Sequence, residues 1–211
     1  MATPKKQSVK KPPIAKKKIT LEKLFPWLLI ILGAIGLLAS FVLTVEKMNT
    51  LSNPTYDPSC NINPILSCGS VMTTEQASIF GITSSLFGVV GFSIIAGIGG
   101  VLLTGVTITA NWFWRTMLGA TALGALFSAY LIFTSIYVIT TLCPYCMVVW
   151  VVMIALFWYT STYAIKHKHV PAPKWLESFA SRYHLDSLLL IYGVILLMII
   201  TKFWYYWKTL I

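Results

Sequence analysis

Four cysteines are the residues of this sequence best suited to chemistry, and they fall into two pairs. Cys60 and Cys68 are separated by seven residues, whereas Cys143 and Cys146 form a Cys-x-x-Cys motif much later in the chain. Paired thiols form static disulfides, exchange disulfides with other thiols, or bind a metal such as Zn²⁺. Cysteine chemistry is therefore the first function to consider, and these three alternatives remain open at this point.

The Cys-x-x-Cys motif is predicted to begin a helix. Pro144 suits the first helical position, because it lacks the N–H that would be unsatisfied there. Cys143 is then at the N-cap, where the positive end of the helix dipole lowers a thiol pKa. Cys146 lies one turn deeper on the same face, which Trp150 and Met153 extend. One thiol is expected to face water and the other an apolar pocket.

The earlier pair lies in a stretch rich in turn-forming residues. Asn61, Asn63, Pro64, Ser67 and Gly69 occur between or beside its two cysteines. Such a stretch is predicted to be a mobile loop that meets a protein outside and then swings to Cys143. The alternatives are a structural disulfide with no redox role, or one half of a four-cysteine zinc site shared with the Cys-x-x-Cys motif.

The elements that position these cysteines are membrane helices. The chain is 57% hydrophobic and only 10% charged, with a mean hydropathy of +0.77, which is more apolar than a soluble fold of this size can bury. Each uncharged run of about 20 residues spans a bilayer. We therefore predict an all-α integral membrane protein with five transmembrane helices, at about residues 25–45, 84–103, 116–139, 143–165 and 187–207.

The basic residues predict how these helices are oriented. Residues 1–23 form a tail with eight lysines, and 13 of the 16 Lys and Arg fall on the side of the membrane that holds this tail. Basic residues stay in the cytoplasm, so the N-terminus is predicted to be cytoplasmic. The net charge of +10 then mainly reflects the membrane topology. The lysines of the tail are also expected to contact membrane lipid, and nucleic acid is not expected as a partner.

This topology divides the chain into two parts. Residues 1–23 are the cytoplasmic tail, and residues 24–211 are the transmembrane domain, with an outer loop at 46–83. All four cysteines then face outward, which in a bacterium is the oxidising periplasm. Within the loop a short helix is expected at 70–80, and residues 174–186 are expected to lie on the membrane surface.

The order of the two cysteine pairs now resembles a known family. The chain is similar to the vitamin K epoxide reductase family, specifically to its bacterial members, from the first crossing to the fourth. The DsbB family, which carries its Cys-x-x-Cys in the first outer loop, fits less well. The resemblance depends on Cys60-x7-Cys68-Gly-Ser-Val, Ser78-Ile79-Phe80-Gly81, Ser84-Ser85-Leu86-Phe87-Gly88 and Cys143-Pro144-Tyr145-Cys146.

The resemblance implies a role for each cysteine. Cys60 would exchange with a protein partner, Cys68 would react with Cys143, and Cys146 would pass electrons to a quinone. The implied fold is a four-helix bundle around the quinone site plus one extra helix. The family's quinone-binding positions add Ser84, in place of an asparagine of the animal enzymes.

Three further residues are candidates for the quinone pocket. Trp150 stands where the animal enzymes carry a tyrosine, and this departure, with that at Ser84, favours plain quinone reduction over reduction of vitamin K epoxide. Phe80 and Phe87 are expected to line the pocket as well, although aromatic residues of membrane helices more often only pack.

The implied function is a membrane thiol:quinone oxidoreductase that supports disulfide formation. It would reoxidise a periplasmic DsbA-like protein of thioredoxin fold and reduce ubiquinone or menaquinone. Many bacterial relatives carry a fused thioredoxin-like domain, which this sequence lacks, so a separate partner is expected. No metal site is predicted, since His167 and His169 are too few ligands and lie on the cytoplasmic side. The alternatives are a structural or zinc-binding membrane protein, and a true vitamin K epoxide reductase.

Overall fold

The computed structural model describes residues 21–53, 55–63, 65–72, 74, 78–79, 82–170, 183–205 and 208. The expectations for the basic tail before residue 21, for Phe80, for the surface segment at 174–182 and for Trp207 lie outside these residues.

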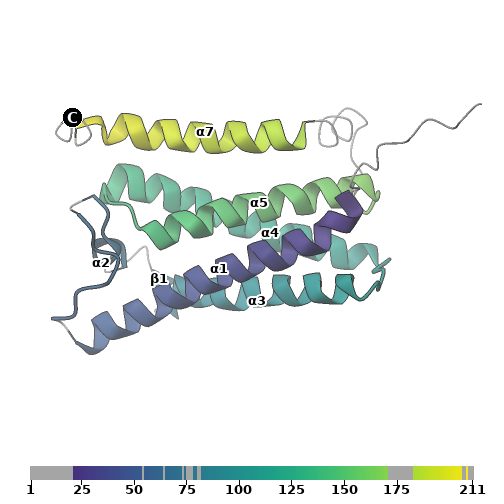
Figure 1. Cartoon of the computed structure of the whole chain (residues 1–211), viewed down its shortest axis with the longest axis horizontal. Helices are drawn as coiled ribbons and strands as arrows, with labels where there is room; N and C mark the ends of the chain where they lie inside the picture. Colours follow the sequence, from purple (N-terminus) through teal and green to yellow (C-terminus); the bar gives the residue numbers. More distant parts are fainter. Residues whose placement is uncertain are drawn as a thin grey trace, which may run out of the picture.

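Five helices are long and apolar enough to cross a membrane. They are α1 (Leu21–Ser52), α3 (Ser84–Leu103), α4 (Asn111–Phe133) with its π-helical continuation η2 (Thr134–Ile139), α5 (Pro144–Lys166) and α7 (His184–Lys202). A short helix, α2 (Cys68–Met72), and two antiparallel two-residue strands, β1 (Ser78–Ile79) and β2 (Ile82–Thr83), lie between α1 and α3. The predicted fold class, an all-α integral membrane protein, is confirmed (Figure 1).

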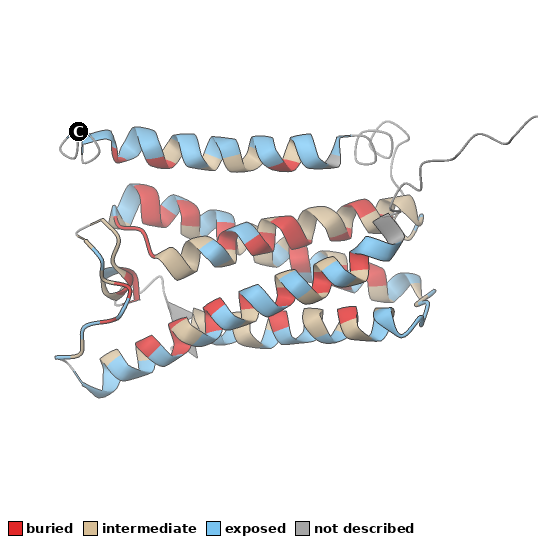
Figure 2. Ribbon diagram, viewed as in Figure 1, coloured by how far each residue is buried: buried red, intermediate tan, exposed pale blue. Residues whose placement is uncertain are grey.

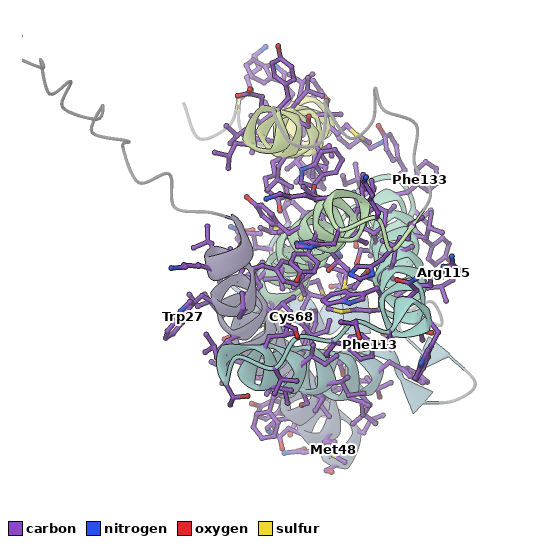
Figure 3. All side chains as sticks on the ribbon, turned by 90° about the vertical axis from the view of Figure 1, so that its right-hand side faces the viewer. Trp27, Met48, Cys68, Phe113, Arg115 and Phe133 are labelled. Atoms are coloured by element: carbon purple, nitrogen blue, oxygen red, sulfur yellow. A yellow bond between two sulfur atoms is a disulfide. The ribbon has the colours of Figure 1, made fainter. Side chains whose placement is uncertain are left out.

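Four of the five helices form a bundle, and the fifth lies beside it. Helix α1 packs along α3 and α5, and α4 packs along α5, whereas α3 and α4 have few direct contacts. Helix α7 runs along the outside, against α5 and η2, and most of its residues are exposed (Figures 1 and 2). The end view in Figure 3 shows the same separation of α7 from the other helices. This is the predicted arrangement of four helices plus one.

Helix α1 is longer than the sequence predicted. Its expected end was Val45, because the charged pair Glu46 and Lys47 follows, but the helix continues to Ser52. Both charged side chains bond to the segment that comes after the helix: Glu46 accepts hydrogen bonds from two hydroxyls there, and Lys47 donates to the Met72 carbonyl. The predicted boundary was wrong because these charged side chains form hydrogen bonds within the protein, so the helix can continue through them.

Helix α4 also departs from the expected boundary. It begins at Asn111, five residues before the expected start, and continues into the π-helix η2. This π-helix ends at Ile139, and the next residue, Thr140, has a left-handed φ of 55°. Trp114 was expected at the membrane interface together with Trp112. Only Trp112 is exposed, whereas Trp114 is buried and donates from its indole N–H to the Ile108 carbonyl at 2.8 Å.

Aromatic packing closes the end of the bundle opposite the cysteines. Phe25 stacks on Tyr163 at a ring-centroid distance of 4.2 Å, and the Trp114 ring stacks on His169 at 5.4 Å. Along α1 and α3 small residues permit close approach. A β-carbon on Gly99 would lie 3.0 Å from the Pro26 carbonyl oxygen, so the two helices touch there through backbone. The glycine-rich α3 was expected to pack closely for this reason.

The other helices of the prediction need smaller adjustments. Helix α3 has the expected bounds, and α5 is shifted by one residue at each end. Helix α7 begins three residues earlier than expected and ends at Lys202, before the expected end at 207. The short helix expected at 70–80 is instead α2 at Cys68–Met72, with β1 following it. The Thr74 hydroxyl bonds to the Val71 carbonyl at 2.8 Å, which satisfies a carbonyl that a longer helix would have used.

Candidate active site: two cysteine pairs beside an apolar cavity

The first cysteine pair is a disulfide buried at one end of the bundle. Cys60 and Cys68 are joined at an S–S distance of 1.99 Å, with their Cα atoms 5.6 Å apart. Cys60 is 4% exposed and Cys68 is fully buried. Cys68 begins α2, which lies at the left-hand end of the molecule in Figure 1. We call this the cysteine end of the bundle.

The segment between α1 and α2, residues 53–67, is the cysteine loop, and its backbone is attached to the strand-like segment before α5. Leu142 donates from its N–H to the Ile65 carbonyl at 2.7 Å, and Ser67 donates to the Leu142 carbonyl at 3.0 Å. These bonds make a parallel bridge between Leu66 and Leu142. Cys68 is therefore held next to Cys143, and no swing of the loop is needed to bring them together.

Asn61 organises the interior of the cysteine loop. Its side-chain oxygen accepts hydrogen bonds from the Ser67 hydroxyl at 2.9 Å and from the Gly69 N–H at 3.1 Å, and its amide donates to Asp57. The turn residues that suggested a mobile loop thus form a bonded loop in this structure. Cys60 and Cys68 are neighbours because Asn61 folds the chain between them.

Cys143 lies at the N-cap of α5, as predicted. Its φ and ψ of −107° and 119° are extended, Pro144 occupies the first turn, and its sulfur accepts from the Cys146 N–H at 3.4 Å. Its pKa is lowered, chiefly because the Cys146 thiol donates to it; burial opposes this, and the N–H groups of Cys146 and Tyr145 assist. A lower pKa gives more of the nucleophilic thiolate.

The two pairs meet at a sulfur–sulfur contact. The Sγ atoms of Cys143 and Cys68 are 3.3 Å apart, and both cysteines are fully buried. Cys143 and Cys146 are free thiols. A thiolate in contact with one sulfur of a disulfide is the arrangement required for thiol–disulfide exchange. The site is therefore able to move a disulfide from one pair to the other.

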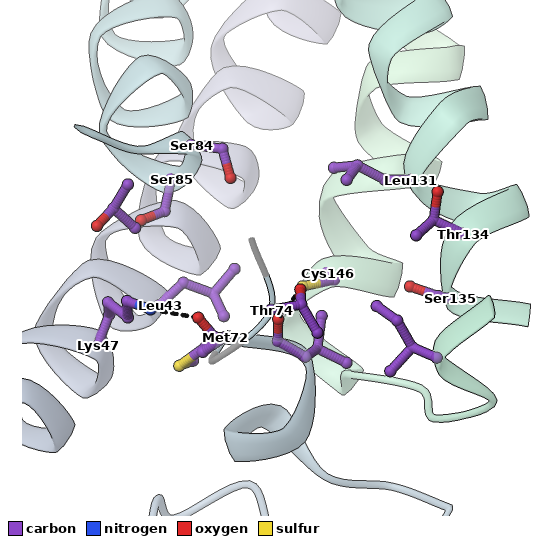
Figure 4. Close-up of a pocket in the computed structure, with 13 residues that line it drawn as sticks. Leu43, Lys47, Met72, Thr74, Ser84, Ser85, Leu131, Thr134, Ser135 and Cys146 are labelled. Atoms are coloured by element: carbon purple, nitrogen blue, oxygen red, sulfur yellow. Dashed lines mark hydrogen bonds between the residues drawn. The ribbon is translucent and has the colours of Figure 1, made fainter. Parts of the chain in front are cut away.

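Cys146 stands between two cavities. The smaller, about 60 Å³, is lined by apolar side chains, by six residues that carry hydroxyl groups and by Lys47. Figure 4 shows Cys146 between Ser84 and Ser85 on one side and Leu131, Thr134 and Ser135 on the other. The larger, about 660 Å³, is mainly apolar and shares Ser84, Ser85, Leu131 and Cys146 with the smaller one. Its volume is within the range of pockets that hold drug-sized ligands.

The larger cavity follows the gap between α3 and α4. Its lining runs from Ser84 at the cysteine end to Trp112 and Phe113 at the opposite end. Phe87 and Leu123 line it from the two facing helices and are both exposed on the bundle surface. The cavity thus opens sideways, toward the space that lipid fills around a membrane protein.

Three of the four residues predicted for a quinone pocket line this larger cavity: Ser84, Phe87 and Trp150. Trp150 is 3% exposed, and its indole nitrogen is buried with no hydrogen-bond partner in the described part of the chain. Met72 lines the smaller cavity and packs in the cluster that contains the buried cysteines. Phe80 lies outside the described residues.

Sequence reasoning missed two features of the site. Glu46 was placed in the outer loop, although it is a buried helical residue beside the cysteine loop. The hydroxyls of Thr134 and Ser135 were read as part of an ordinary helix, although η2 gives them a π-helical position beside Cys146. The position of Glu46 directly after an apolar run was a weak indication of this role, because a carboxylate that is buried there needs hydrogen-bond partners.

The structure also bears on the histidines and on the alternative of a zinc site. His169 pairs with Asn111 at 2.7 Å, and its pKa is lowered by burial and by the neighbouring His167. No group of three His, Cys, Asp or Glu suited to a metal ion occurs within the described residues. The Cys60–Cys68 disulfide also occupies two of the four thiols that a zinc site would need.

Comparison with known proteins supplies the family. The model of the vitamin K epoxide reductase family matches residues 27–161. The chain belongs to the vitamin K epoxide reductase family. The match extends from α1 to most of α5, so it contains all four cysteines and the cavity, and α7 lies beyond it. A search among curated proteins finds no match.

Membership of the vitamin K epoxide reductase family makes the protein a multi-pass membrane oxidoreductase that uses cysteines. All four cysteines of the chain lie within the matched region. The family resemblance predicted from the motifs is confirmed.

Proposed function

We propose that this protein is a thiol:quinone oxidoreductase of a bacterial inner membrane. It would reoxidise a periplasmic DsbA-like protein and reduce ubiquinone or menaquinone, and so support disulfide formation. The N-terminus would be cytoplasmic and the cysteine end periplasmic. The observation that carries the proposal is the position of Cys146, the free thiol that borders the large apolar cavity while its partner Cys143 contacts Cys68.

The cavity fits a lipid-soluble quinone. A quinone ring has two carbonyl oxygens that need hydrogen-bond donors, and the buried indole N–H of Trp150 is a donor without a partner in the described residues. The hydroxyl of Ser84 also borders the cavity. The sideways opening between α3 and α4 suits a ligand that arrives from the bilayer with an apolar tail. When bound, the quinone accepts two electrons and two protons.

The proposed steps balance in sulfur and electrons. A partner thiolate attacks Cys60 and breaks the Cys60–Cys68 bond, and the second partner thiol then releases an oxidised partner and two thiols. Cys68 and Cys60 next regain their disulfide from an oxidised Cys143–Cys146 pair, which is reduced. The reduced pair gives two electrons and two protons to the acceptor and becomes a disulfide again.

The described arrangement matches one stage of this cycle. A Cys60–Cys68 disulfide beside free Cys143 and Cys146 is the combination expected just before electrons leave for the quinone. At that stage the lowered pKa of Cys143 favours its thiolate, and the hydrogen bond from the Cys146 thiol keeps the second proton next to the cavity.

A turnover assay tests the proposal. The purified protein in detergent would receive dithiothreitol as the thiol donor and a short-chain ubiquinone or menadione as the acceptor. We expect loss of quinone absorbance that depends on protein and on all four cysteines. No quinone-dependent turnover, or no quinone-dependent change in thiol alkylation, would identify the cysteines as static clips. Incubation with vitamin K epoxide, followed by chromatography, tests the alternative activity directly.

A further inference from the structure

The buried state of Cys60 conflicts with its task in the proposed relay. A partner thiolate must approach this sulfur along the S–S bond, yet Cys60 is 4% exposed and packs against Leu43, Val71 and Met72. Access therefore requires that the chain around Cys60 move away. The structure shows what holds that part of the chain in place.

A buried carboxylate binds the residues just before Cys60. Glu46 is 7% exposed and lies in the part of α1 that continues past the predicted boundary. One of its oxygens accepts from the Ser59 hydroxyl at 2.6 Å, and the other accepts from the Tyr56 hydroxyl at 3.0 Å. Leu43, one turn earlier on α1, packs in the cluster that contains Cys60. Helix α1 therefore fixes the Cys60 side of the cysteine loop.

The Cys68 side of the loop is fixed by different groups. The backbone bridge between Leu66 and Leu142 holds it to the segment before α5, and Cys68 itself begins α2. The Glu46 carboxylate does not hold this side, because within the described residues both of its oxygens bond to residues 56–59. The Glu46 bonds thus act on the Cys60 side alone, whereas the Cys68 side is held by the Cys-x-x-Cys segment and by the bond from Lys47 of α1 to the Met72 carbonyl.

We propose that Glu46 is a positioning residue that keeps residues 56–59 closed over Cys60, and that a partner reaches Cys60 only when these two hydroxyl bonds open. This inference rests on the proposed relay. When the bonds open, the partner thiolate attacks the Cys60 sulfur and the Cys60–Cys68 bond breaks. Cys68 leaves with the electron pair as a thiolate, still held beside Cys143, and the partner is joined to Cys60 until its second thiol releases it.

The bonds that hold Cys68 to the segment before α5 do not involve Glu46. Opening at Glu46 exposes Cys60 without moving Cys68, so contact with a protein outside does not disturb the 3.3 Å contact between Cys68 and Cys143. The closed state also shields the disulfide from small thiols. Partners that offer their own acceptors and donors to Tyr56 and Ser59 would open it most readily.

The test measures the reduction rate of the Cys60–Cys68 disulfide by dithiothreitol in the purified full-length protein. Samples are alkylated at intervals and the four cysteines are mapped by mass. For Glu46→Ala we expect reduction about tenfold faster or more, since two charge-assisted hydrogen bonds are lost. Glu46→Gln retains an acceptor oxygen and a donor for the same hydroxyls, so its rate should lie within about threefold of the parent.

Two further measurements separate positioning from loss of structure. Thr50→Ala removes a hydroxyl that bonds to the Glu46 carbonyl on the same helix and should leave the rate unchanged. In a protein that also carries Cys60→Ala and Cys146→Ala, oxidation joins Cys68 to Cys143, and Glu46→Ala should not lower the yield. If Glu46→Ala does not accumulate, Tyr56→Phe combined with Ser59→Ala removes the same bonds from the loop side and should accelerate reduction likewise.

Three outcomes would overturn the inference: an unchanged reduction rate in Glu46→Ala, no rescue by Glu46→Gln, or a fall in the Cys68–Cys143 yield that parallels the faster reduction. These outcomes concern access to Cys60 alone. Failure of the proposed function would instead appear as absent quinone reduction by the parent protein, whatever residue stands at position 46.

Discussion

The two cysteine pairs are in atomic contact but are positioned by different kinds of structure. Cys60 lies in the cysteine loop and Cys68 begins α2 directly after it, and hydrogen bonds of Glu46, Asn61 and Leu142 hold this part of the chain. Cys143 and Cys146 belong to the first turn of a membrane helix, where the N-cap and a proline determine their geometry. One pair can be released locally, and the other is fixed to the bundle.

This difference matches the two kinds of reactant that the proposed cycle requires. A protein partner demands a sulfur that can be uncovered, and local hydrogen bonds in a loop open at lower cost than a packed helix. A membrane-dissolved acceptor demands a sulfur held beside an apolar cavity, and a helix provides this with little motion. The two halves meet at the contact between the Cys68 and Cys143 sulfurs and at the backbone bridge between Leu66 and Leu142.

Removal of the Cys146 sulfur, which borders the large cavity, should have the largest effect on quinone reduction. Cys146→Ala leaves Cys143 without a partner for its disulfide, so quinone reduction should fall at least about a thousandfold, to the level without protein. The measurement is quinone absorbance with dithiothreitol as donor. Tyr145→Phe, which keeps both sulfurs of the motif, should retain activity. Full turnover in Cys146→Ala would refute the proposed path to the quinone.

Removal of the Cys68 sulfur, which contacts Cys143, should stop disulfide exchange between the two cysteine pairs. In Cys68→Ala, Cys60 has no intramolecular partner, so its thiolate attacks the disulfide of the oxidised protein partner, which breaks that bond and frees one partner thiol. The resulting mixed disulfide should be visible on non-reducing gels of membranes. Turnover with the partner should be lost, since Cys143 has no sulfur to exchange with. The absence of any trapped species in Cys68→Ala, with a trapped species in Cys60→Ala, would reverse the assigned roles.

The lowered pKa of Cys143 predicts a particular pH dependence. A lowered pKa means that the thiolate persists to lower pH, so alkylation of Cys143 by iodoacetamide should begin below the pH at which an ordinary thiol reacts. Cys146→Ala removes the donor that is the main cause, so the pKa rises and the midpoint of the alkylation profile should move to higher pH. Identical profiles in both proteins would show that the Cys146 thiol does not stabilise the Cys143 thiolate.

The smallest expected effect concerns the recognition of the acceptor. Trp150→Phe keeps an aromatic ring in the cavity wall but loses the indole N–H, at a cost of about 1 kcal/mol if that group bonds to a quinone carbonyl. The KM for a short-chain ubiquinone should rise about threefold to tenfold, while the reduction rate of the Cys60–Cys68 disulfide stays constant. Trp112→Phe, at the exposed far end of the cavity, is the matched control and should leave KM unchanged.

Local signals predicted the position of the two thiols on the helix but not the burial of Cys143, which was expected to face water and is fully buried. The uncharged run and Pro144 are enough to place Cys143 at the N-cap and Cys146 one turn deeper, because both depend only on neighbouring residues. The length of apolar runs likewise predicted five crossings, and one of them, α3, has the expected bounds. The family resemblance carried by the motifs was confirmed by the matched region.

The loop half required information that neighbouring residues do not carry. The bridge from Leu66 to Leu142 joins segments far apart in sequence, and the turn-forming residues around Asn61 gave no sign that their side chains would bond to one another. Glu46 looked like the start of a loop because a charge ends an apolar run. Trp114 looked interfacial because tryptophan is favoured both at interfaces and, with its N–H bonded, in cores.

The spacing of Cys143 and Cys146 has a consequence for how far electrons travel. Three residues of helix rise only about 4.5 Å. In the proposed cycle this single turn separates sulfur chemistry that begins in an aqueous protein from reduction of a molecule dissolved in hydrocarbon. In this cycle the protein would act as a phase-transfer catalyst, since one turn of α5 joins the Cys68–Cys143 contact to the apolar cavity beside Cys146.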